Sequence, residues 1–170
     1  MRKLILPVCL AVVAITLCCC SSSRQFDKTT VTDFDLDRYL GKWYEIARYD
    51  HRFERGMHKC TAEYVKNTDG SIRVINRGVK NGKPKESIGK AKTTTTPGLL
   101  RVSFWGPFYS DYRVLMLAPD YSYALVGSGT YGYLWILSRT PTLPEATIHQ
   151  IYTEASRRGY DTSGLIMVEQ

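Results

Sequence analysis

The chain has 170 residues, of which 44% are hydrophobic and 23% are charged, so it can bury the core of one globular domain without disulfide staples. Its 23 Lys and Arg exceed its 16 Asp and Glu, and the formal net charge of +7 suits contact with anionic lipid surfaces or head groups. The basic residues are dispersed rather than gathered into a stripe between stacking aromatics, which argues against a nucleic-acid-binding protein.

The amino-terminal segment has the layout of an export signal. Arg2 and Lys3 precede an apolar run over residues 4–17, which is shorter than a membrane-spanning helix requires and matches the core of a signal peptide. The three cysteines and three serines that follow, at 18–23, resemble a bacterial lipoprotein signal, in which the first cysteine of the mature chain carries acyl groups. Loss of the leader would lower the net charge to +5, because Arg2 and Lys3 leave with it.

Cys20 is predicted to be the lipid-bearing residue, because Leu17 lies three places before it. Cys19 is the alternative, since a cysteine replaces the usual small residue before Cys20. The chain then divides into a signal peptide over 1–19, a lipidated polar tether over 20–30 and a folded domain over 31–170. Cys60 would be the one cysteine of that domain, which excludes an intradomain disulfide and favours a buried, unreactive thiol.

Beyond residue 40, short segments with strand character alternate with turn residues. Asp69-Gly70, Asn81-Gly82 and Pro97-Gly98 are strong turn signals. Eight strands are predicted, at 42–49, 59–66, 72–77, 85–95, 99–104, 112–117, 121–126 and 131–138. A helix at 143–158, ended by Gly159, and a short strand at 165–168 beside the first strand complete the expected elements.

Eight strands joined by short turns are the number with which an up-and-down barrel encloses one small ligand. Twelve Tyr, five Phe and three Trp also favour strands and an aromatic interior. The predicted fold class is therefore all-β: an eight-stranded antiparallel up-and-down β-barrel with one C-terminal α-helix packed outside.

Four sequence motifs carry a resemblance to a known family. They are WYEIAR at 43–48, which follows Gly41 in a Gly-x-Trp pattern, DHRFERG at 50–56, FWGPFY at 104–109 and YLWILSRTP at 133–141. Together and in this order they resemble the lipocalin family, and within it the apolipoprotein D-like branch of bacterial outer-membrane lipoproteins. The resemblance covers nearly the whole chain after residue 30.

Gly41, Trp43 and Arg139 are expected to close one end of the barrel. A glycine before Trp43 lets the chain bend sharply, and the indole can then plug the end of the barrel. The planar guanidinium of Arg139 can stack over that indole and donate to nearby carbonyls. The resemblance implies that this pair is structural.

Period-two alternation predicts which side chains face the barrel interior. Trp43 facing inward places Glu45, Ala47 and Tyr49 inside, and outward Arg73 and Arg77 place Val74 and Asn76 inside. The predicted ligand-binding residues are Ala47, Tyr49, Val74, Ala91, Val102, Phe104, Val114, Met116, Tyr133, Trp135 and Leu137, with Arg52 and Arg55 in a basic loop at the open end. Small residues among the inward positions are expected to leave room for a ligand.

Signals for an enzyme are weak. The glycine pattern at 127–132 resembles a dinucleotide-binding loop, but it runs into a strand where a phosphate-binding helix is required, so a hairpin loop is predicted. His51, His58 and His149 are too scattered for a metal site, and Glu45 has no nucleophile beside it in the sequence. We therefore predict no catalytic residue, no metal and no cofactor, and a protein that is not an enzyme.

The expected function is that of a lipid-anchored envelope lipocalin that binds and stores or transports a hydrophobic ligand. The resemblance implies a fatty acid or lysophospholipid as ligand and an outer-membrane location, and it leaves a homodimer open. The periplasmic face is expected, although the sequence leaves the membrane face open. The dispersed basic residues predict no nucleic-acid partner. Two alternatives remain: a lipocalin-fold enzyme acting on a lipid-like substrate, and an interaction lipoprotein whose barrel is filled by its own side chains.

Overall fold

The computed structural model describes residues 26–170, and the predictions for the leader and for Cys19 and Cys20 lie outside this range. The elements follow the order α1 (Leu36–Tyr39), β1 (Gly41–Tyr49), β2 (Met57–Lys66), β3 (Ile72–Lys80), β4 (Lys83–Thr93), β5 (Leu99–Trp105), β6 (Phe108–Leu117), β7 (Tyr123–Gly127), β8 (Leu134–Ser138), α2 (Glu145–Arg157), η1 (Thr162–Gly164) and β9 (Leu165–Met167). No helix among these residues is long and apolar enough to cross a membrane.

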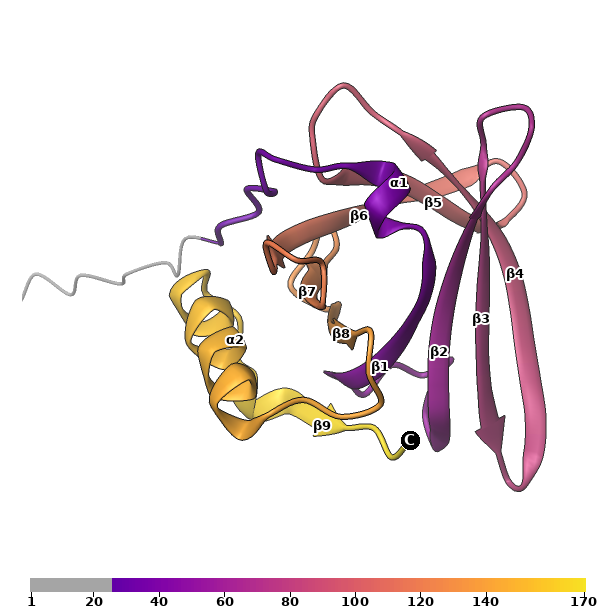
Figure 1. Cartoon of the computed structure of the whole chain (residues 1–170). Helices are drawn as coiled ribbons and strands as arrows, with labels where there is room; N and C mark the ends of the chain where they lie inside the picture. Colours follow the sequence, from indigo (N-terminus) through magenta and orange to yellow (C-terminus); the bar gives the residue numbers. More distant parts are fainter. Residues whose placement is uncertain (1–25) are drawn as a thin grey trace, which may run out of the picture.

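The sheet closes into an antiparallel barrel. Its strand order is β2-β3-β4-β5-β6-β7-β8-β1-β9, and additional pairing between β1 and β2 joins the two sides. Helix α2 packs outside the barrel, and β9 pairs with the end of β1 (Figure 1). The predicted fold class, an eight-stranded barrel with one C-terminal helix and a short strand beside the first strand, is confirmed.

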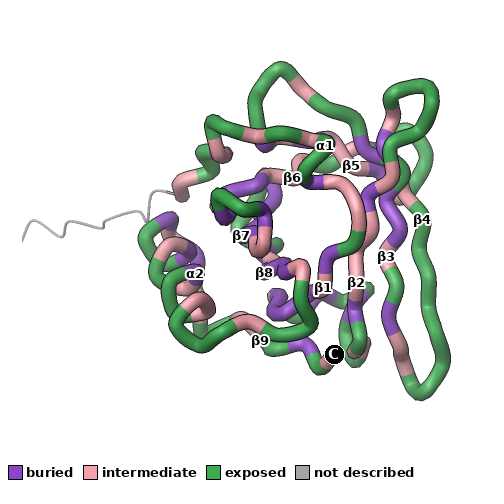
Figure 2. The backbone as a smooth tube through the Cα atoms, viewed as in Figure 1, coloured by how far each residue is buried: buried purple, intermediate pink, exposed green. Residues whose placement is uncertain are grey.

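Two apolar clusters hold the barrel together. The first fills the barrel interior around Trp43, Tyr64, Leu100 and Val126. The second lies between the outside of the barrel and α2, where Ile151 and Ala155 of the helix are fully buried. Figure 2 shows the contrast between these buried positions and β4, most of whose length is exposed.

Some elements differ from the predicted ones in their existence or in their first residue. The helix α1 was not predicted; it has four residues and begins at Asp35, whose carboxylate accepts from the backbone N–H of Asp37 at 2.9 Å. Strand β6 begins at Phe108 rather than 112, and β8 begins at Leu134 rather than 131. Asn81 and Gly82 both have positive φ in the β3–β4 turn, as their dipeptide indicates.

Because successive strands run antiparallel, their connections gather at two ends. The connections at 67–71, 94–98 and 118–122 lie at the end that α1 and Trp43 close. The connections at 50–56, 81–82, 106–107 and 128–133 lie at the opposite, open end. The basic loop after β1 therefore lies at the open end, as its sequence predicts.

Strands β2, β3 and β4 form a long blade that stands apart on the right of Figure 1. They pair with one another along almost their whole length, from Met57↔Lys80 to Val65↔Arg73 and from Lys80↔Lys83 to Ile72↔Ala91. The blade pairs with β1 only at 61–64 and with β5 only at 90–93. Both attachments are therefore in the half of the blade nearer the closed end.

The C-terminal residues occupy the gap where β1 and β2 diverge. Val168 donates its backbone N–H to the carbonyl of Ile46 at 2.9 Å, and Lys59 donates to the carbonyl of Glu169. The Gln170 side-chain amide donates to the carbonyls of Glu45 (2.6 Å) and Cys60 (3.1 Å). This segment thus links β1 to β2 beyond the point where the two strands pair.

Residues 26–31, part of which was assigned to the tether, pack on the barrel. The Phe26 ring lies 3.9 Å from that of Tyr131, and the backbone N–H of Asp27 donates to the carbonyl of Arg158 at 3.0 Å. The Thr30 hydroxyl donates to the carbonyl of Pro97 at 2.7 Å. The chain therefore runs along the outside of the barrel from the 128–133 loop to the closed end.

Candidate functional site

Trp43 seals the closed end. Its side chain is fully buried, its indole N–H donates to the carbonyl of Tyr39 at 2.8 Å, and its ring packs against the Tyr39 ring. The Arg139 guanidinium lies 3.8 Å from the indole centroid and donates to the carbonyls of Arg38, Tyr39, Leu40 and Lys42. Gly41 has φ of +91°, a conformation that glycine adopts without strain. The expected stacking at this end is present.

Three tyrosines fill the interior above Trp43. The hydroxyls of Tyr39 and Tyr112 are 2.6 Å apart, and the Tyr64 hydroxyl donates to that of Tyr112 at 2.8 Å. Burial raises the pKa of all three phenols above its usual value, so they are neutral hydrogen-bonding groups. The closed half of the interior is therefore occupied by aromatic side chains.

Most of the predicted lining residues do face the interior. The interior cluster contains Val74, Ala91, Val102, Phe104, Val114, Trp135 and Leu137. Of these, Val102, Phe104 and Trp135 are only partly buried. The room expected beside small inward residues is filled at Gly89, however, because a Cβ there would lie 2.8 Å from the Phe104 ring. The partly buried members mark the half of the interior nearer the open end.

The predicted inward orientation is wrong for Ala47, Tyr49 and Met116. All three belong to the outer cluster under α2. The register of β1 against β8 shifts between Glu45 and Ala47, and that of β6 against β7 shifts between Val114 and Met116. A β-bulge inserts one extra residue, so the alternation of faces changes beyond it. Arg48 consequently takes the inward position that was assigned to its neighbours.

Arg48 lies at the centre of a buried polar cluster in the open half of the interior. It is 1% exposed, and it donates to the Glu45 carboxylate at 2.5 Å and to the carbonyls of Glu54 and Met57 at 2.8 and 3.1 Å. Its Nη1 also lies 3.7 Å from the Cys60 sulfur. Sequence reasoning missed Arg48, because a charged residue within a strand was taken as outward, as Arg73 and Arg77 are.

Glu54 and His51, from the 50–56 loop, complete the cluster as uncharged groups at neutral pH. Burial, and next the Glu45 carboxylate, raise the pKa of Glu54 to about 8, although it accepts from the Trp135 indole N–H at 3.2 Å. Burial, and next the Arg48 charge, lower the pKa of His51 to about 4. The Arg48 and Glu45 charges offset each other, so the cluster is close to neutral overall.

Three buried polar atoms in this half have no hydrogen-bond partner. They are Nε of Arg48, Nε2 of His51 and Oδ1 of Asn76, and a fourth such atom, the Tyr160 hydroxyl, belongs to the outer cluster. Asn76 lies on β3 between inward Val74 and Gly78, whose Cβ position would contact Cys60. A buried polar group without a partner costs free energy unless a ligand or water satisfies it.

The rim of the open end is aromatic and basic. The His51 ring stacks on Phe53 at 5.4 Å and on Tyr133 at 4.7 Å, and the ring centroids of Tyr133 and Trp135 are 5.8 Å apart. Predicted Arg52 is exposed, and predicted Arg55 pairs with Asp50 at 2.8 Å on the surface. Tyr133 therefore lies at the entrance rather than within the interior, and Arg48 is the basic group inside.

Glu54→Gln is expected to flatten the pH dependence of stability between about 4.5 and about 8. The folded chain holds a proton on Glu54 that the unfolded chain releases at a lower pH, so the wild type loses stability as the pH rises through this window. Glutamine has no proton to lose. The melting temperature of the variant should exceed that of the wild type at about pH 9 and match it at about pH 5. Glu86→Gln, at an exposed position, is the control. Parallel pH profiles for all three proteins would contradict a raised pKa of Glu54.

The remaining chemical motifs do not form a second site in the described part of the chain. The glycine-rich residues 128–133 connect β7 to β8, so the predicted hairpin is correct. Among residues 26–170, no group of three or more His, Cys, Asp or Glu could hold a metal ion. Cys60 is buried, and burial raises the pKa of its thiol to about 11, which keeps it in the unreactive thiol form.

Comparison with known proteins agrees with this architecture. Residues 34–170 match the family described as a lipocalin-like domain. The chain is 44% identical to the outer membrane lipoprotein Blc of Escherichia coli K12 over 174 aligned positions, covering 100% of this chain and 98% of that protein. It is 49% identical to the Vibrio cholerae protein of the same name over 82% of this chain and 85% of that one.

More distant relatives share the same fold. Mouse apolipoprotein D is 33% identical over 81% of this chain and 78% of its own. The structure of insecticyanin from Manduca sexta superimposes with a TM-score of 0.73 at 24% identity, covering 85% of each chain. The barrel, its sealed end and these matches together show that the chain belongs to the lipocalin family.

Proposed function

We propose that the chain binds an amphiphile with a long acyl chain, such as a fatty acid or a lysophospholipid, in the open half of the barrel interior. The observation that carries this proposal is the set of three buried polar atoms without a hydrogen-bond partner in the open half of the interior, beside the apolar side chains of its wall. Arg48 Nε–H can donate to an anionic oxygen, and Asn76 Oδ1 can accept from a hydroxyl or ammonium group. An acyl chain would lie against Val102, Phe104 and Trp135, where each buried methylene contributes roughly 0.8 kcal/mol.

We also propose that the protein is held at the outer membrane by acyl groups on Cys20. Support comes from the Cys18-Cys19-Cys20 run after the apolar leader and from the name outer membrane lipoprotein carried by relatives that the chain matches over 82–100% of its length. Two or three acyl chains give stable anchoring where one is marginal. The protein would then store or transport its ligand in the cell envelope.

Val102→Trp is expected to weaken binding of a long-chain fatty acid. Val102 faces the interior and is partly buried, so a larger side chain should occupy space that an acyl chain would take. Excluding two methylenes costs about 1.6 kcal/mol, which is roughly tenfold or more in Kd. The measurement is a titration of delipidated protein followed by quenching of Trp fluorescence or by native mass spectrometry.

Lys92→Trp is the matched control, because Lys92 is exposed on the adjacent strand. It should bind as the wild type does. Equal Kd for Val102→Trp and wild type would place the ligand elsewhere. If the wild type takes up neither fatty acid nor lysophospholipid, the barrel is filled by its own side chains. If it binds a lipid and converts it to a product, the protein is an enzyme. Comparing the acid with its matching alcohol at low and high salt measures the contribution of Arg48, Arg52 and Arg55.

A further inference from the structure

The open rim of the barrel carries most of the large apolar side chains that the described chain exposes. Five of the eight such residues lie there: Phe53, Trp105, Phe108, Tyr131 and Tyr133. The two most exposed, Trp105 at 83% and Phe108 at 79%, flank the β5–β6 turn. Of the other three, Ile88 is in the middle of β4, and Ile166 and Met167 are on β9, so none is at the closed end. Apolar side chains concentrated at one end of a barrel indicate a contact surface.

The charged residues are also distributed unevenly between the open and closed ends of the barrel. Residues 50–59 and 80–86, which form the loop after β1 and the tip of the blade, contain six Lys or Arg against three Asp or Glu, and Glu54 is buried. The closed-end connections, at 31–40, 67–71, 94–98, 118–122 and 139–144, contain five Asp against two Arg. The open end is therefore positive and aromatic, while the closed end is negative and lacks exposed apolar side chains.

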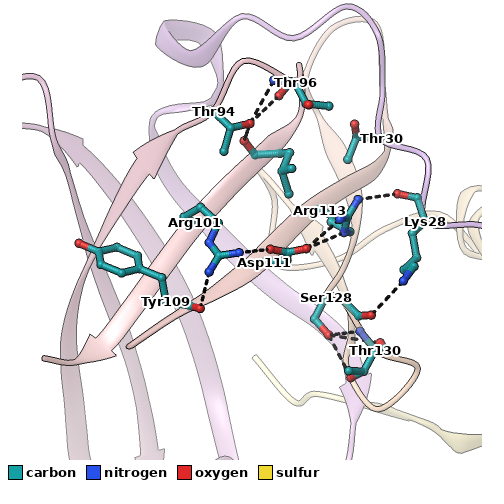
Figure 3. Close-up of polar contacts among 12 residues, drawn as sticks. Lys28, Thr30, Thr94, Thr96, Arg101, Tyr109, Asp111, Arg113, Ser128 and Thr130 are labelled. Carbon is teal, nitrogen blue, oxygen red and sulfur yellow. Dashed lines mark hydrogen bonds and ion pairs between the residues drawn. The ribbon is translucent and has the colours of Figure 1, made fainter. Parts of the chain in front are cut away.

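Aromatic and basic residues also lie together on the outer face beside the β5–β6 turn. The ammonium groups of Lys90 and Lys92 lie 5.8 and 4.6 Å from the Tyr109 ring centroid. Arg101 of β5 donates to the carbonyl of Tyr109 at 2.8 Å and to Asp111 at 2.7 Å (Figure 3). Exposed aromatics beside lysines suit the boundary between acyl chains and anionic head groups of a bilayer.

The described chain also begins at the open end. Phe26 packs against Tyr131. The Lys28 ammonium donates to the carbonyl of Gly129 at 3.4 Å, and the Lys28 backbone carbonyl accepts from the Arg113 guanidinium at 3.1 Å (Figure 3). Five residues lie between Cys20 and Phe26, and the six steps along the chain cannot extend further than about 20 Å. A ten-residue strand such as β6 spans about 33 Å. An anchor on Cys20 would keep the open end nearer to the membrane than the closed end.

From these observations we propose that the open rim docks on an anionic phospholipid bilayer, with Trp105 and Phe108 inserted among the acyl chains and the blade lysines against the head groups. This inference rests on the lipid anchor proposed above. The entrance of the barrel then faces the membrane that holds the protein, so an acyl chain can pass between bilayer and interior without crossing bulk water.

The test uses the acylated protein purified from membranes and reconstituted into vesicles of phosphatidylcholine with or without phosphatidylglycerol. Phospholipids brominated on their acyl chains should quench most of the emission attributable to Trp105, identified by subtracting the Trp105→Phe variant. Phosphatidylglycerol should strengthen this quenching, and Lys83→Glu/Lys85→Glu should return it to the level without phosphatidylglycerol. Each lysine contributes about fivefold to partitioning, the equivalent of ~1 kcal/mol. Exposed Lys66→Glu at the closed end is the matched control and should change nothing.

Different failures have different meanings. A protein that does not remain with the vesicles overturns the anchor and this inference together. A protein that stays on the vesicles while Trp105 is quenched by aqueous iodide and not by lipid bromine overturns the docking alone. A third outcome is that neither quencher reaches Trp105, that this shielding is lost on dilution, and that phosphatidylglycerol does not change it. This outcome would show that the rim binds a second copy of the chain and would also overturn the proposal.

Discussion

Arg48→Met is expected to destabilise the fold by about 3–5 kcal/mol, because it leaves the buried Glu45 carboxylate without its cation. Glu45 is 7% exposed, and burial already raises its pKa against the opposing effect of Arg48. The substitution also removes the donors to the carbonyls of Glu54 and Met57, which hold the 50–56 loop against the interior. Urea unfolding at about pH 5 and about pH 8 should show the larger loss at the higher pH, where an unpaired Glu45 must take up a proton to stay buried.

Glu45→Gln in the Arg48→Met background should recover part of this loss, because it removes the unpaired charge. Arg73→Met, on the exposed face of β3, is the matched control and should change the free energy of unfolding by no more than about 0.5 kcal/mol. If Arg48→Met is as stable as the control at both pH values, Arg48 does not lie in a buried ion pair.

Trp43→Ala is expected to cost about 3–5 kcal/mol, since it empties the sealed end of the barrel. The indole is fully buried, packs on Tyr39 and supports the Arg139 guanidinium 3.8 Å from its centroid. Arg139→Ala should therefore lose much of its own effect when Trp43 is absent, with a coupling of roughly 0.5–3 kcal/mol in a double-mutant cycle.

Arg139→Lys separates charge from shape in the same experiment. Lysine keeps the positive charge but cannot stack a planar fork over the indole while donating to several carbonyls. It should behave much more like Arg139→Ala than like the wild type. Additive losses for the Trp43 and Arg139 substitutions would rule out packing between the two side chains.

The architecture could be predicted because its determinants are local. Asp69-Gly70 and Asn81-Gly82 each lie between two apolar-periodic segments, and the structure has a turn at both places. Period-two alternation placed Val74 and Ala91 correctly, because the pairing of β3 with β4 has no register shift. The four-residue helix α1 was missed, since one helical turn has almost no periodicity to detect.

The polar part of the candidate site could not be predicted, because it depends on register between strands. A bulge between Glu45 and Ala47 is a property of the pairing of β1 with β8, and it turns Arg48 inward. Arg48 then donates to the carbonyl of Glu54, and its charge acts on His51; both residues belong to a loop whose path the sequence does not show. An arginine that follows the apolar pair Ile46-Ala47 and precedes Tyr49 is a weak sign of burial, but by itself it does not separate the two faces of a strand.

The blade of β2, β3 and β4 has a mechanical consequence. It is joined to β1 and β5 only in its half nearer the closed end, and eight and nine paired positions make it stiff internally. A stiff plate fixed along one half behaves as a cantilever, whose displacement is largest at its free tip. Bending of the blade would change the aperture of the barrel while leaving every hydrogen bond within the blade intact. Gln170 and Arg48 connect the wall of β1 to Cys60 and Met57 on the blade, so their hydrogen bonds would restrain this bending.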